Sequence, residues 1–195
     1  MVQKMNSHED SLRTKDYSTD FLPQLDFIGE AKKIKGIMKA TEFSLAFKSS
    51  VATPGRLTEM LKESPKILHI SCHGLNLTVK AGPTYDRDKA EKTNCLLFEK
   101  ENGEGHLMDS LRLNALIRQA LPDLDVIFLA ACNSEFAGRI FLKCGAKHVI
   151  CIKKDNEVLD KAAIDFTDKF YSHVISGDSV CQAFDKAKAA VEFLH

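Results

Sequence analysis

The sequence predicts a single α/β domain with a mostly parallel sheet that is covered by helices on both faces. Short apolar runs rich in β-branched residues recur along the chain, and segments with helical periodicity separate them. A length of 195 residues suits one core, and 44% hydrophobic with 28% charged residues is an ordinary globular composition. Strands that alternate with helices form parallel sheets through right-handed crossovers.

Apolar residues three or four positions apart predict six helices. Local signals mark several ends: Pro122 stops the third helix and Gly145 caps the fourth. The expected helices are Asp26–Met38, Leu57–Lys62, Leu107–Leu121, Phe136–Lys143, Val158–Ile175 and Val180–Leu194.

Five segments have the alternation or the continuous apolar character of strands. The segment Leu75–Thr93 is rich in Gly, Pro and charge, so we expect a surface excursion there. The expected strands are Glu42–Phe47, Ile67–Cys72, Cys95–Phe98, Val126–Ala131 and His148–Ile152.

Residues 1–20 are polar and are expected to form a loose segment before a domain at 21–195. The 27 basic and 27 acidic residues balance, so nothing draws the whole chain to nucleic acid or to an anionic membrane. No apolar run reaches the roughly 20 residues that span a bilayer, and the N-terminus lacks a secretory signal pattern. We therefore expect a cytoplasmic protein.

The six cysteines occur singly, with no C-x-x-C pair, which excludes a disulfide framework or a zinc module. Five of them are expected to be buried core residues, and only Cys132 is placed for chemistry. Cys144 and His148 could share a metal, but no second pair completes a tetrahedral set, so no metal is expected. The absence of Walker A and Gly-x-Gly-x-x-Gly patterns argues against a nucleotide cofactor.

Two apolar strands each lead directly into a chemically capable side chain. Ile67–Cys72 ends at His73-Gly74, and Val126–Ala131 ends at Cys132. Because the carboxyl ends of neighbouring parallel strands meet at one edge, and ligand sites lie there, we expect the imidazole and the thiol to face each other.

This pairing has the chemistry of a nucleophilic site. A cysteine attacks as its thiolate, which a nearby imidazole or helix N-terminus favours, and Cys132 directly precedes the predicted helix at Phe136. The backbone N–H groups of Gly74 and Cys132 are candidates for an oxyanion hole. His73 is the candidate general base and the proton donor to the leaving amine.

The residues alone leave other interpretations open. The His-Gly pair could be a turn, and the Ala-Cys pair could end in a core residue. His69 and Ser71 share a strand face with His73 by two-residue alternation, so a merely polar strand end is a further interpretation.

Four sequence runs, in this order and with suitable gaps, resemble a CHAT domain, which belongs to the caspase, separase and gingipain group of cysteine peptidases. The resemblance extends over about Asp26 to Leu194. It implies a three-layer caspase-like fold and a cysteine endopeptidase without a cofactor. The His-Gly motif of the family aligns with His73 and Gly74, and the Ala-Cys motif of the family aligns with Ala131 and Cys132. The four runs are Leu68–Gly74, Phe128–Glu135, Cys144–Ile150 and Phe170-Tyr171 with Ser179–Phe184.

The chain departs from the family pattern in two places. Family members begin with a strand, and Tyr17–Leu25 is a poor candidate for it. We expect that this first strand is absent, lost or supplied by a partner, which would leave an open sheet edge. The family's Trp-x-x-x-Asp pattern is also missing. Asp160 best matches its aspartate, and Asp160 with Asp155 would select a basic residue before the cut. Lys153 and Lys154 would instead select an acidic one, and a solvated turn without a selective role is the third alternative.

The first functional hypothesis is therefore an endopeptidase that cleaves protein substrates through a Cys132–His73 dyad. The alternative is a catalytically silent CHAT-like module with a regulatory or protein-interaction role, inactive until a partner completes the sheet. The resemblance also implies a signalling or sensor partner, and neither hypothesis calls for nucleic acid or a membrane.

Overall fold

A computed structural model describes residues 22–79, 91–120, 123–153 and 160–194, and six helices and six strands lie within them. The α/β class is as predicted, and each of the six predicted helices is present. The predicted domain boundary at residues 20–21 and the predicted start of the fifth helix at Val158 lie outside the described residues. In chain order the elements are α1 (Phe27–Lys39), α2 (Pro54–Lys62), β1 (Ile67–Ser71), β2 (His73–Val79), β3 (Glu91–Glu99), β4 (Gly105–Met108), α3 (Ser110–Ala120), β5 (Val126–Ala130), α4 (Glu135–Lys143), β6 (His148–Cys151), α5 (Asp160–Ile175) and α6 (Val180–Leu194).

One sheet is parallel and has the order β1-β5-β6. Ile67 of β1 lies opposite Val126 of β5, and Val126 lies opposite His148 of β6. The central strand β5 is the most apolar, with its first four residues buried, as the sequence pattern predicts for a strand covered on both faces.

The other sheet is antiparallel, with the order β2-β3-β4, and it corrects two predictions. The segment predicted as a surface excursion, 75–93, lies partly in β2 and β3, because buried Leu77 pairs with Thr93 and the Asn76 amide donates to the Asn94 side-chain oxygen at 2.9 Å. Residues 80–90 lie outside the described part. The sheet is also not mostly parallel: of the described strands, three are parallel and three antiparallel.

The third predicted helix begins later than the sequence pattern indicates. Leu107 lies in β4 opposite Leu97 of β3, which extends the strand predicted at Cys95–Phe98 into a three-strand sheet. Asp109 then starts α3: its carboxylate accepts a hydrogen bond from the Arg112 N–H at 2.9 Å, and its carbonyl accepts one from the Leu113 N–H.

The strand predicted at Glu42–Phe47 is wrong. The segment alternates apolar and polar residues, but neither described sheet includes it, and Phe43 remains 69% exposed. Alternation forms a strand only where a neighbouring strand pairs with the backbone and a core accepts one face. Among the described residues no strand pairs with this segment, and only Phe47 at its end packs against a core.

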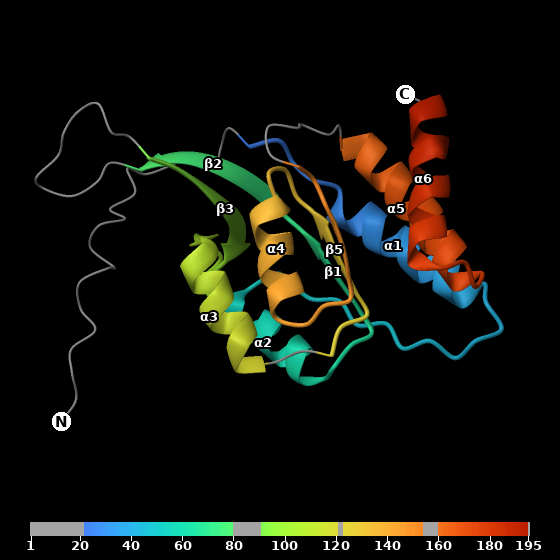
Figure 1. Cartoon of the computed structure of the whole chain (residues 1–195), viewed down its shortest axis with the longest axis horizontal. Coiled ribbons are helices and arrows are strands. Elements are labelled where there is room, and N and C mark those ends of the chain that lie inside the picture. The colour runs from blue at the N-terminus through green and yellow to red at the C-terminus, as the bar shows by residue number, and fades with distance from the viewer. Residues whose placement is uncertain (1–21, 80–90, 121–122, 154–159, 195) are drawn as a thin grey trace, which may run out of the picture.

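Helices cover both faces of the parallel sheet, with α2, α3 and α4 on one side of β1 and β5 and α1, α5 and α6 on the other (Figure 1). Alternate strand residues supply each side: Leu68 and Leu129 point toward the first group of helices, and Phe128 and Ile150 toward the second. The carboxyl ends of the strands are therefore left at one edge between two helical layers.

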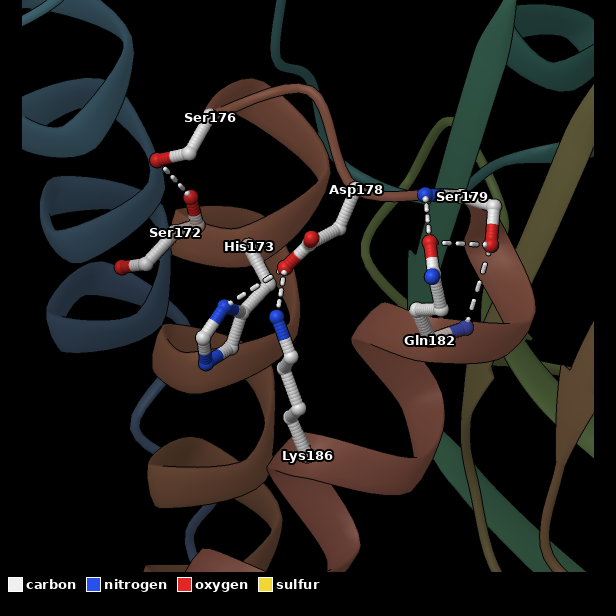
Figure 2. Close-up of polar contacts among 7 residues, drawn as sticks. All are labelled: Ser172, His173, Ser176, Asp178, Ser179, Gln182 and Lys186. Carbon is white, nitrogen blue, oxygen red and sulfur yellow. Dashed lines mark hydrogen bonds and ion pairs between the residues drawn. The ribbon is translucent and has the colours of Figure 1, made fainter.

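The connection between α5 and α6 is fixed by polar side chains (Figure 2). Asp178 lies 2.9 Å from Nδ1 of His173 and accepts a hydrogen bond from Lys186 at 2.7 Å, and Lys186 and His173 together hold the pKa of Asp178 below its ordinary value. Ser179 and Gln182 form a capping box, in which the Gln182 N–H donates to the Ser179 hydroxyl and the Ser179 N–H donates to the Gln182 side chain. Gly177 has a φ of +99°, which glycine adopts without strain.

Candidate active site

Cys132 lies in a tight turn between a strand and a helix. β5 ends at Ala130, Ala131 is buried, and Cys132 is half-buried. Asn133 has a φ of +52°, the left-handed region that Asn tolerates better than most residues, and α4 begins two residues later. The backbone thus reverses from strand to helix directly after the thiol, as predicted for a cysteine at a helix start.

Ser134 fixes this turn, and sequence reasoning missed it. Its fully buried hydroxyl donates to the carbonyl of Leu129 at 3.4 Å and accepts from the Ile152 N–H at 3.1 Å. The Glu135 N–H also donates to the Ile152 carbonyl at 3.2 Å. A serine just before a helix is typical of an N-cap, but here its side chain does not cap α4. It instead ties the cysteine turn to the end of the neighbouring strand β6.

The His73-Gly74 pair meets the cysteine turn through the backbone. The Cys72 N–H donates to the carbonyl of Ala130 at 3.3 Å, which carries the β1–β5 pairing to the point where β2 begins. Two residues further along, Gly74 lies against the backbone of Cys132. A Cβ atom added to Gly74 would overlap the carbonyl oxygen of Cys132 and lie 2.6 Å from its carbonyl carbon. Only glycine permits this approach, so the two motif ends are in direct contact, with His73 half-buried beside them.

Three thiols other than Cys132 lie in surroundings that disfavour the thiolate. Burial raises the pKa of Cys72 to about 12 and that of Cys95 to about 11, and burial with nearby Glu135 also raises the pKa of Cys151. These three thiols therefore stay protonated and unreactive at neutral pH.

The prediction that the five remaining cysteines are buried holds fully for only two of them. Cys144 and Cys151 are half-buried, and Cys181 is exposed. Cys181 lies in the first turn of α6, where a residue on the outer side of the helix contacts solvent. Exposure alone therefore does not single out Cys132, whereas its position at the contact with Gly74 does.

The two predicted specificity residues lie at the limit of what is described. Asp155 falls in 154–159, outside the described residues, and Asp160 is the first residue of α5, with its side chain likewise outside the description. Lys153 is exposed. The selection of a basic side chain stays a prediction.

No helix in the described ranges is both long and apolar enough to cross a membrane. Across these same residues, no group of three or more His, Cys, Asp or Glu side chains could hold a metal ion. Cys144 and His148 accordingly gain no further ligand from the described part of the chain.

Fold and site together define a mixed α/β domain in which a cysteine turn and a His-Gly pair meet at the carboxyl edge of a parallel sheet. The family model of the CHAT domain matches residues 4–192, and the chain belongs to that family. No curated protein is similar enough in sequence to be counted as a relative.

Proposed function

We propose that this protein is a cysteine endopeptidase with a three-layer caspase-like fold and a Cys132–His73 dyad. The observation that carries the proposal is the contact between Gly74 and the backbone of Cys132, because it brings two motifs 58 positions apart in sequence, 132 − 74, to one point. Membership of the CHAT family, which is generally peptidase-like, supports the same reaction class.

In the proposed reaction, His73 takes the proton of the Cys132 thiol, and the thiolate attacks the carbonyl carbon of a peptide bond. A carbon–sulfur bond forms, and the negative charge moves to the carbonyl oxygen, which accepts hydrogen bonds from the N–H groups of Gly74 and Cys132. The carbon–nitrogen bond then breaks as His73 gives its proton to the leaving amine. Water, deprotonated by His73, hydrolyses the thioester and restores the thiol.

We propose a protein substrate with a basic residue before the cut, which Asp160, with Asp155, would recognise through charge. The reaction needs no cofactor, because a thiolate, an imidazole and two amides supply each step. We place the protein in the cytoplasm, with a signalling or sensor partner as its regulator and neither nucleic acid nor a membrane as a target.

The test is covalent labelling with peptidyl acyloxymethyl ketones that carry Arg, Lys, Asp or Glu before the reactive carbon, read by intact mass. We expect one label per chain, lost in Cys132→Ala and strongly slowed in His73→Gln. Cys144→Ala is the matched control, because it removes another half-buried thiol and should change nothing. Equal labelling of all variants would reject the dyad and favour the silent regulatory module.

Specificity is read from the order of the probes. Asp160→Ala should weaken labelling by the Arg and Lys probes and leave the acidic probes unchanged. Asp165→Ala removes a carboxylate from the same helix, where it pairs with Lys33 at 3.4 Å, and should not alter the order. An unchanged order in Asp160→Ala would overturn the assignment of that residue.

A further inference from the structure

A cluster of buried polar side chains lies beneath the strand that leads to His73. Glu30 of α1 is 5% exposed, although its neighbours in the core cluster are mainly apolar and aromatic. Its Oε1 atom accepts a hydrogen bond from the hydroxyl of fully buried Thr167 at 3.1 Å. The same oxygen lies 3.3 Å from Nε2 of His69, within ion-pair distance but without the geometry of a hydrogen bond.

His69 is held from three sides. Its ring stacks on Phe128 with centroids 4.5 Å apart and an interplanar angle of 11°, and its Nδ1 lies 3.1 Å from the Tyr171 hydroxyl. Burial and the nearby Glu30 raise the pKa of Tyr171, so this hydroxyl keeps its proton. The imidazole therefore has one defined orientation between Glu30 and Tyr171.

The electrostatic balance keeps Glu30 charged. Burial by itself would raise its pKa, but contacts with His69, Ser71 and Thr167 outweigh burial and hold the pKa below its ordinary value of 4.5. The ionisable groups that face this carboxylate are His69 from β1 and Tyr171 from α5. Lys33 and Asp165 pair with each other farther out between α1 and α5.

Stability alone does not account for such a cluster. Replacing a buried ion pair by apolar residues of similar volume is often neutral or stabilising, since removing charges from water costs free energy. The position of the cluster is more informative. Glu30 acts on His69 and Ser71, the β1 residues four and two positions before His73. Thr167 and Tyr171 lie on α5, the helix that begins at Asp160.

We infer that Glu30 is a positioning residue for the site: its carboxylate holds α1, β1 and α5 together so that His73 stays aligned with Cys132. The catalytic consequence of this inference rests on the proposed function. The alignment of His73 is a structural property, and it can be measured separately from activity. Glu30 does not touch the reacting atoms and acts through Ser71 and His69.

The experiment compares Glu30→Gln with Thr53→Ala. The glutamine removes the charge and keeps the shape, whereas Thr53→Ala removes a buried N-cap hydroxyl on α2, a helix of the opposite face. Two properties are read: the imidazole NMR resonances of His73, assigned by their loss in His73→Gln, and the rate at which iodoacetamide alkylates Cys132, followed against pH by intact mass.

We expect Glu30→Gln to move the His73 resonances and to slow alkylation by about tenfold, within the range that small misplacements of reacting groups cause. Thr53→Ala should lower the melting temperature and change neither property. Unchanged His73 resonances in a folded Glu30→Gln protein would overturn the inference. If Glu30→Gln does not fold, Thr167→Val is measured in the same way, and it removes one hydrogen bond to the carboxylate.

Failure of the proposed function gives a different result. In that case His73→Gln alkylates as fast as the unchanged protein, because the imidazole does not activate the thiol. The His73 resonances of Glu30→Gln still decide whether Glu30 positions this residue.

Discussion

The two faces of the parallel sheet are built from the same strands but differ in chemistry. Toward α2, α3 and α4, β1 and β5 direct Leu68, Ile70, Ile127 and Leu129 into an apolar core around Phe141. Toward α1, α5 and α6, the alternate residues include His69 and Ser71, and the core there contains a buried carboxylate. The β1 and β5 side chains that enter the first core are all apolar, whereas those on the second face include a histidine and a serine that contact the buried carboxylate.

The strand residues of the polar face lie at even sequence intervals from the two residues that carry the proposed chemistry. His69 and Ser71 precede His73 at intervals of two, and Phe128 and Ala130 precede Cys132 in the same way. The buried carboxylate therefore lies on the face whose strand side chains lead, at intervals of two, to the two residues of the proposed dyad. The β1 and β5 side chains on the other face make no polar contact of this kind in the described part of the chain.

The largest expected effect is on the apolar face. Phe141→Ala removes a fully buried ring and should lower the free energy of unfolding by about 3–5 kcal/mol, since it loses transfer free energy and leaves a cavity. Urea unfolding measures the loss from the shift of the midpoint, provided that the dependence of the free energy on urea concentration is unchanged. Leu142→Ala, one residue along α4 and 50% exposed, is the control and should cost less than about 0.5 kcal/mol. Similar losses in both would mean that Phe141 is not a core residue.

The next effect separates stability from positioning on the polar face. Glu30→Leu alone leaves the His69 ring and the Thr167 hydroxyl without their partner and should lower the free energy of unfolding by about 1–3 kcal/mol. Glu30→Leu with His69→Leu removes both polar groups of the contact and should recover most of that loss. Alkylation of Cys132 should stay slow in the double variant. If the double variant recovers both stability and the alkylation rate of Cys132, the polar groups of this face do not position the site.

An exposed pair between the same two helices provides the matched control. Lys33 and Asp165 join α1 to α5 at 3.4 Å, with the lysine side chain 42% exposed. Lys33→Ala should change stability by only about 0–1 kcal/mol, because solvent screens exposed charges. A loss as large as that of Glu30→Leu would show that the helix contact, and not the buried charge, determines the effect.

Local signals made much of the fold predictable. Asp26, whose side chain accepts from the Gly29 N–H, starts α1, and Thr53 before Pro54 starts α2. The continuous apolar runs of β1 and β5 predicted buried strands, and the residues at their ends predicted where the thiol and the His-Gly pair would be sought.

What the sequence did not predict depends on distant partners. β2 and β4 are recognisable only because each pairs with β3, and Glu42–Phe47 has strand alternation without a described partner. Glu30 looks like an ordinary exposed residue of a helical first turn until the fold brings His69 and Thr167 to it. Ser134 similarly carries an N-cap signal, but its hydroxyl accepts from the N–H of Ile152, the residue after β6.

A smaller effect follows from the pKa of Glu30, which its contacts with His69, Ser71 and Thr167 hold below 4.5 against the opposing effect of burial. A lowered folded-state pKa means that ionised Glu30 contributes stability above about pH 4.5 and that this contribution is lost as the pH falls through the folded-state value. Urea midpoints measured from neutral pH downward should therefore decline less steeply in Glu30→Gln. Equal slopes below pH 4.5 would mean that this carboxyl is not stabilised as an ion.

A last prediction concerns the polar contacts between α5 and α6, which lie away from the Glu30 cluster and should stabilise only their own turn. Ser179→Ala removes the capping-box hydroxyl of α6 and should cost about 1 kcal/mol, since the Gln182 N–H loses its acceptor. Ser176→Ala, on the same connection, removes a hydroxyl that donates to the Ser172 carbonyl and should cost less. Neither variant should move the His73 resonances, because the α5–α6 turn does not contact Glu30 or His69 in the described contacts. A shift of those resonances in Ser179→Ala would show that the whole polar face, and not the Glu30 cluster, holds the strand end in place.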